Sequence, residues 1–119
     1  MVDVPSSPIF ESVTVSATSG GASGTVLFTV PSNHDATVEF LTITNGASSS
    51  QTVTIEIYKN VGTAYKNLYK ATTVAGNTVA KVLDADRLHL SVGDKIVCSK
   101  NGGTIDISMS GRLYYNPNR

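Results

Sequence analysis

Residues 38–60 read VEFLTITNGASSSQTVTIEIYKN, which is two β-rich runs joined by a polar loop. In the second run, residues 53–60, valine and isoleucine alternate with more polar side chains, as is typical of a strand with one buried face. The first run, residues 38–44, is more apolar and predicts a central strand that is covered on both faces. Because Asn45 and Gly46 form a turn signal, we expect the two runs to make a central antiparallel hairpin on which the other strands are laid.

Similar runs, separated by turn residues, recur along the rest of the chain. Residues 64–71 carry tyrosine and leucine at helical spacing, but a short isolated helix is marginal, so we predict an irregular strand there. The Asn-Gly-Gly triplet at 101–103 is the strongest hairpin signal, because a tight turn needs positive φ at its centre. The predicted strands cover residues 9–17, 25–30, 38–44, 53–60, 64–71, 78–83, 87–92, 95–100 and 104–115.

Eight or nine short strands without a convincing helix predict an all-β fold, a single antiparallel β-sandwich that is jelly-roll-like or Greek-key. We expect an extended N-terminal arm at residues 1–8, where Pro5 and Pro8 oppose regular pairing, and a C-terminal tail at 116–119. The β-sandwich domain should occupy residues 9–115. The arm is interpreted either as a frayed end or as a segment that lies on a neighbouring subunit.

The apolar runs also predict which side chains form the core of the sandwich. We expect the buried set to include Phe40, Ile43, Val53, Ile55, Ile57, Ile96, Ile105 and Ile107.

The composition agrees with a β-rich structural protein. Hydrophobic residues make up 40% of the 119 residues and charged residues only 15%, against roughly 25% in an average protein. Serine, threonine and valine each occur 14 times, and the last two favour strands. The formal net charge is zero and no basic stripe is visible, so we expect no nucleic-acid partner. A neutral, hydroxyl-rich surface suits a protein packed against neighbours.

The cysteine content and the hydropathy pattern indicate the compartment in which the protein assembles. Cys98 is the single cysteine, so no intrachain disulfide can form, which fits assembly in a reducing compartment such as a host cytoplasm. Residues 1–12 show neither a basic nor an apolar signal-peptide region. No run of ~18 apolar residues is present, so we expect no membrane span.

No catalytic or cofactor-binding motif stands out. His34 and His89 are the two histidines, and although Asp35 follows His34, no nucleophile-elbow motif accompanies them. We interpret both as surface or turn residues and expect no enzyme activity. One cysteine and two distant histidines do not make a zinc site, and the glycine-rich loops do not match phosphate-binding patterns, so we expect no cofactor.

Two further features have a functional and a structural interpretation. Asp84, Asp86 and Asp94 flank one predicted strand and could converge on Ca²⁺, although aspartate is also common in turns. Cys98 alternates with Ile96 on an apparent core face, which favours a buried structural thiol over a nucleophile.

The closing run, residues 113–117, is the most interesting surface candidate. Its two consecutive tyrosines must point to opposite faces of a strand, so one of them should face outward. Tyrosine is enriched at interfaces because it combines a flat apolar body with a polar tip. The candidate interface residues are Val2, Val4, Ile9, Tyr114 and Tyr115.

Several segments together resemble the small β-sandwich structural proteins of tailed bacteriophage virions. The similar segments are VPSNH at 30–34, VEFLTITN at 38–45, VTIEIYKN at 53–60, LSVGDKIVCSKNGG at 90–103 and IDISMSG at 105–111. The resemblance covers about residues 24–113 and rests on turn-and-strand patterns. It implies a virion protein present in many copies, packed symmetrically and without catalysis, as a capsid decoration or cement protein, a head–tail component or a tail component.

These features allow three hypotheses for the function of the chain. The leading hypothesis is a virion structural protein that forms a homo-oligomer and docks on other capsid or tail proteins. The second is a carbohydrate- or receptor-binding module, in which the five tyrosines would supply stacking surfaces, although the chain lacks tryptophan. A small hydrolase ranks last because no triad is visible. The tyrosines are Tyr58, Tyr65, Tyr69, Tyr114 and Tyr115.

Overall fold

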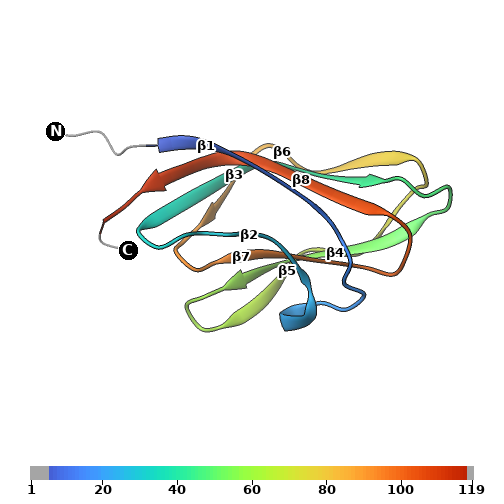
Figure 1. Ribbon diagram of the computed structural model, residues 1–119, viewed down its shortest axis with the longest axis horizontal. Coiled ribbons are helices and arrows are strands. Elements are labelled where there is room, and N and C mark those ends of the chain that lie inside the picture. The colour runs from blue at the N-terminus through green and yellow to red at the C-terminus, as the bar shows by residue number, and fades with distance from the viewer. Residues whose placement is uncertain (1–5, 118–119) are drawn as a thin grey trace.

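The computed structural model describes residues 6–117, which form eight strands and one short 3₁₀ turn (Figure 1). The 3₁₀ turn spans Gly21–Ser23. The strands are β1 Ser6–Thr14, β2 Thr25–Thr29, β3 His34–Asn45, β4 Gln51–Lys59, β5 Ala64–Val74, β6 Thr78–Leu90, β7 Lys95–Lys100 and β8 Ile105–Tyr115. Within residues 6–117, no helix is long and apolar enough to cross a membrane.

The strands make two four-stranded antiparallel sheets that pack face to face (Figure 1). One sheet has the order β1-β8-β3-β6 and the other the order β2-β7-β4-β5. Between consecutive strands the chain crosses from one sheet to the other, except at β4 and β5, which pair as neighbours. This is the double Greek-key order of a jelly roll, so the predicted all-β sandwich is confirmed.

The expected central hairpin at residues 38–60 is wrong, because β3 and β4 lie in different sheets. Asn45 organises the crossover between them and is fully buried. Its side-chain amide donates to the carbonyl oxygens of Ser49 and Val74, both at 3.0 Å, and its oxygen accepts from the Ala47 amide at 2.9 Å. The turn at 101–103 also joins strands of different sheets, β7 and β8, and is not a hairpin.

β6 is one long strand where the sequence predicted two, at 78–83 and 87–92. The polar break at 84–86 is an irregularity in which Ala85 has φ 60°, and β6 carries extra residues there relative to β3. The strand predicted at 64–71 is confirmed as part of β5, whose pairing with β4 is also irregular.

The core lies between the sheets and contains seven of the eight side chains predicted for it. Phe40 is the exception and is 42% exposed. A bulge explains the error: Val38 pairs with Gly111 and Phe40 with Ser110, so Glu39 is an extra residue that reverses the alternation. Its neighbour Leu41 is fully buried in place of Phe40. The core side chains predicted correctly are Ile43, Val53, Ile55, Ile57, Ile96, Ile105 and Ile107.

The described part of β1, Ser6–Thr14, includes three residues that the sequence assigned to the arm. Ser6, Ser7 and Pro8 pair with residues 112–114 of β8 in the same chain, and the Arg112 guanidinium donates to Ser6 Oγ at 3.0 Å. Pro8 is tolerated because β1 is an edge strand, where a missing amide donor need not break a ladder on both sides. Residues 1–5 and 118–119, which include Val2 and Val4, lie outside the described residues.

Candidate functional site

The face of the β1-β8-β3-β6 sheet that points away from the other sheet carries hydroxyl side chains, several charged side chains and two exposed phenylalanine rings. We call it the outer face. Phe10 of β1 and Phe40 of β3 both align with Ser110 of β8, so the two rings flank a small side chain in one cross-strand row. Phe10 is 70% exposed and Phe40 42%. We call these three residues the phenylalanine patch.

Serine and threonine continue the outer face next to the phenylalanine patch. The next row along the strands is Ser12, Ser108 and Thr42, in which Ser108 Oγ donates to Ser12 Oγ at 3.3 Å. A shallow depression of 90 Å³ lies between the rings and this row. The outer face therefore offers both projecting rings and a hollow. Their surroundings include charged as well as hydroxyl side chains, since Asp84 of β6 aligns with Phe40 and Lys81 aligns with Thr42.

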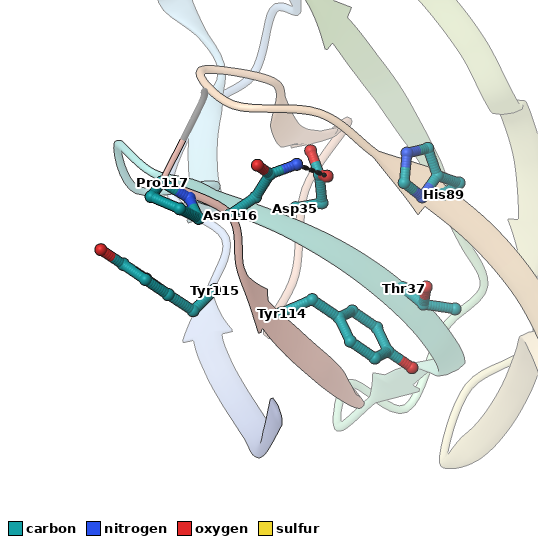
Figure 2. Close-up of a pocket in the computed structure, with 7 residues that line it drawn as sticks. All are labelled: Asp35, Thr37, His89, Tyr114, Tyr115, Asn116 and Pro117. Atoms are coloured by element: carbon teal, nitrogen blue, oxygen red, sulfur yellow. Dashed lines mark hydrogen bonds between the residues drawn. The ribbon is translucent and has the colours of Figure 1, made fainter. Parts of the chain in front are cut away.

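At the other end of the same face lies a larger concavity of 490 Å³, the C-terminal pocket (Figure 2). Three neighbouring strands and the segment after β8 contribute to it, which is why no single stretch of sequence shows it. It is lined by Asp35 and Thr37 of β3, His89 of β6, Tyr114 and Tyr115 of β8, and Asn116 and Pro117.

The strand register and the path of the chain after β8 together build this pocket. Tyr114 lies beside Asp35, and Thr37 lies beside His89, so a phenol, a carboxyl, a hydroxyl and an imidazole share one end of the sheet. Figure 2 shows the Tyr114 side chain extending toward Thr37 across this face.

The segment after β8 closes the pocket. The backbone amide of Asn116 donates to the Asn33 carbonyl at 2.6 Å, and the Asn116 side-chain amide donates to Asp35 Oδ2 at 3.2 Å (Figure 2). Asn33 has φ 63°, a left-handed conformation that asparagine tolerates better than most residues. Two hydrogen bonds from Asn116 thus hold the segment that directly follows β8 against the sheet.

The predicted interface residues fall in different places. Tyr114 lies on the outer face, whereas Tyr115 points to the opposite side and packs edge-on against His34, with ring centroids 5.5 Å apart. The expectation that the consecutive tyrosines diverge therefore agrees with the structure. Ile9 packs partly buried against the core and lines a separate 470 Å³ groove between the edge strands β1 and β2.

The remaining tyrosines lie in the other sheet. Tyr58 of β4 and Tyr65 of β5 are cross-strand partners with ring centroids 4.9 Å apart, and Lys95 Nζ lies 5.4 Å from the centroid of the Tyr58 ring. Tyr69 is partly buried and packs against the core. The five tyrosines therefore do not form one surface.

Sequence reasoning missed Phe10 and Phe40 as an exposed pair, and Asp35, Thr37 and Asn116 as pocket residues. Of these residues, only Phe10 could have been predicted as exposed from the sequence, because it lies on the same side of β1 as Ser12 and Thr14. The others depend on cross-strand register, which a single sequence does not display.

The aspartates considered for Ca²⁺ do not converge. Asp94 is buried and its carboxylate accepts hydrogen bonds from Lys59 Nζ and from the backbone amides of Asn60 and Ser91, each at 2.9 Å. Asp84 and Asp86 lie exposed on the irregular part of β6, where Asp86 Oδ2 accepts from the Asp84 amide at 3.0 Å. Across residues 6–117, no three His, Cys, Asp or Glu side chains are grouped so as to hold a metal ion.

The groups considered for nucleophilic chemistry are separate as well. His34 Nδ1 lies 2.9 Å from the carbonyl oxygen of Ser32, while His89 is in the C-terminal pocket. Cys98 is fully buried, and this burial raises the pKa of its thiol to about 12. The interpretation of Cys98 as a buried structural thiol is confirmed.

No protein-family model matches this chain, and no curated protein matches it either. Among solved structures, a chain in the structure of infectious bursal disease virus, Gx strain, is similar with a TM-score of 0.51 and 11% sequence identity. The match covers 93% of this chain and 32% of that one, so this chain spans about a third of the length of the similar chain. At this identity the likeness shows the fold alone.

Proposed function

We propose that this chain is a non-enzymatic structural protein of a virion, which works by packing against copies of itself and against other virion proteins. The observation that supports the proposal is the jelly-roll sheet order, together with a structural likeness to a chain from a virus structure that covers 93% of this chain. The low charge and the abundance of serine, threonine and valine also suit a subunit that is packed among neighbours.

The resemblance of residues 24–113 to small β-sandwich proteins of tailed bacteriophages narrows the proposal further. On this basis the chain is a capsid decoration or cement protein, or a head–tail or tail component, and it resides in the virion after assembly in the host cytoplasm. The N-terminal residues 1–5, with Val2 and Val4, are proposed to dock on a neighbouring subunit. A terminal segment can bind a neighbouring subunit by lying in a groove or at a sheet edge.

The outer face is the proposed contact with a second copy. Aromatic side chains are enriched at the centres of protein interfaces, and the phenylalanine patch places two of them beside a row of serine and threonine side chains. A twofold contact uses the same surface on both partners. The outer face meets this condition because it carries both an exposed ring, that of Phe10, and a hollow beside it in which a partner's ring can sit.

Light scattering coupled to size-exclusion chromatography tests the contact. The purified full chain should form an oligomer, and the double variant Phe10→Ser/Phe40→Ser should shift it toward monomer. Val61→Ser is the matched control, because Val61 is 86% exposed in the β4–β5 turn, away from the outer face. An oligomer that the double variant leaves intact would place the contact elsewhere.

The virion assignment is tested separately by quantitative mass spectrometry of purified particles from the source. Hundreds of copies per particle would indicate a decoration protein, and a few tens or fewer a neck or tail component. A chain that is absent from the particles and monomeric in solution would overturn the proposal.

A further inference from the structure

The C-terminal pocket has a lining that the structural role does not need. Its volume, 490 Å³, falls within the range of ~300–1,000 Å³ typical of small-molecule sites. Around one aromatic ring, Tyr114, it gathers a hydroxyl, an imidazole, an amide and a carboxyl group (Figure 2). By comparison, the depression at the phenylalanine patch has a volume of only 90 Å³.

We propose that the C-terminal pocket binds a neutral sugar, such as a terminal hexose or N-acetylhexosamine of a glycan. A pyranose presents an apolar C–H face and a rim of hydroxyl groups. The Tyr114 ring supplies a flat apolar surface on which the C–H face can stack, and its hydroxyl group is a polar tip at the edge of that surface. Thr37, His89 and Asn116 surround it with groups that can both donate and accept hydrogen bonds, as sugar hydroxyls require.

The pocket is also organised before a ligand arrives. Asp35 accepts from the Asn116 side chain, and the Asn116 backbone is bonded to Asn33, so the amide that faces the pocket is held in one orientation. Thr37 stands on the inner strand β3 and is the cross-strand partner of His89 on the edge strand β6. Groups held in place in this way lower the ordering cost of binding.

The charge of the lining selects a neutral sugar over an acidic one. Among the described residues that line the pocket, Asp35 is the carboxylate and none is a lysine or an arginine. The described lining therefore offers a sialic acid, a sulfated sugar or a phosphate no lysine or arginine that could pair with its negative charge. One carboxylate is also too few oxygen ligands for Ca²⁺, which takes six to eight.

An array of immobilised glycans ending in glucose, galactose, mannose, N-acetylglucosamine, N-acetylgalactosamine or sialic acid tests this proposal on the full chain. We expect retention on one or more neutral glycans and none on the sialylated ones. The methyl glycoside of the best-bound terminal sugar is then titrated into ¹⁵N-labelled protein. The largest amide shifts should fall on Asp35, Thr37, His89, Tyr114 and Asn116.

Three variants separate a ligand site from a general change in the protein. Tyr114→Ala removes the stacking surface and should weaken the Kd for the glycoside at least about tenfold, the equivalent of ~1.4 kcal/mol. Thr37→Val keeps the shape and β-branching of a mid-strand residue, removes one hydroxyl, and should weaken binding a few-fold even if Tyr114→Ala folds poorly. Tyr65→Ala in the opposite sheet is the control and should bind as the parent chain does.

Retention of no neutral glycan, or shifts that centre on Tyr58 and Tyr65, would overturn the proposal. So would binding that Tyr114→Ala and Thr37→Val leave unchanged. If the same pocket residues shift with a partner virion protein and with no sugar on the array, the pocket is a protein contact and the sugar proposal fails. These outcomes are independent of the copy number in particles, which tests the structural role.

Discussion

Lys59 Nζ lies 2.9 Å from Asp94 Oδ2, an ion pair that joins the end of β4 to the turn before β7. The Asp94 side chain is almost completely buried, whereas that of Lys59 is 40% exposed. The same carboxylate accepts the backbone amides of Asn60 and Ser91. One aspartate therefore fixes two turns at the same end of the sandwich, one of them the β4–β5 hairpin and the other a crossover between the sheets.

We expect Asp94→Asn to lower the free energy of unfolding by about 1–3 kcal/mol, because the amide group cannot accept all the hydrogen bonds that the carboxylate receives. Lys59→Met should cost less than about 1 kcal/mol, since an exposed partner adds little. Urea unfolding at pH 7 measures both. If the lysine variant proved the more damaging of the two, the ion pair and not the backbone anchoring would be the main contribution.

The stabilisation by Asp94 should depend on pH. Burial alone would raise the pKa of Asp94, but the hydrogen bonds from Lys59, Asn60 and Ser91, with the charge of Lys59, outweigh it and lower the pKa below the ordinary 3.8. The carboxylate therefore contributes its full stabilisation above pH 3.8. This contribution is lost as the pH falls from there through the lower folded-state pKa. The difference in unfolding free energy between the parent and Asp94→Asn should be constant from pH 7 to 5 and shrink below pH 4. If this difference in unfolding free energy already decreased at pH 5, the lowered pKa of Asp94 would be contradicted.

Ile55→Ala should destabilise the domain by about 2–5 kcal/mol, because Ile55 is fully buried between the sheets and its truncation leaves a cavity. Phe40→Ala is the contrasting case. Its ring stands half-exposed on the outer face, so we expect a loss of less than about 1 kcal/mol. Thermal or urea unfolding compares them, and equal losses would mean that Phe40 packs into the core after all.

Cys98 should be unreactive while the domain is folded. Its thiol is fully buried, and a pKa of about 12 leaves almost no thiolate at pH 8. A thiol reagent such as Ellman's reagent should therefore label one cysteine per chain in guanidinium chloride and none, over minutes, in native buffer. Rapid labelling of the native protein would show that β7 opens readily.

Two N-terminal deletions test which residues form the arm. Removal of residues 1–8 takes away Ser6, Ser7 and Pro8, which pair with β8, and should lower the midpoint of thermal unfolding. Each lost hydrogen bond is worth on the order of 1 kcal/mol. Removal of residues 1–5 should leave the midpoint nearly unchanged but weaken incorporation into particles. If both deletions incorporate normally, the arm has no docking role.

Sequence alone assigned the faces of the regular strands. Val53, Ile55 and Ile57 alternate without interruption, and an uninterrupted strand has a period of two, so the prediction that all three are buried is confirmed. Phe40 was misassigned because the alternation reverses at Glu39. That bulge arises where β3 pairs with β8, at a point where a β-carbon on Gly111 would collide with the Thr37 carbonyl oxygen. Its position is a property of the pair of strands and cannot be read from either one.

The turn signals likewise predicted where the chain reverses, and only the tertiary structure decided which sheet receives the next strand. A residue such as Gly46 or Gly102 sets a local backbone preference, whereas the choice of sheet depends on burying the apolar faces of all eight strands at once. The C-terminal pocket was likewise predicted only in part from the sequence. Sequence singled out Tyr114, but the register of β3, β6 and β8 placed Asp35, Thr37 and His89 beside it, because cross-strand neighbours are determined by pairing and not by distance along the chain.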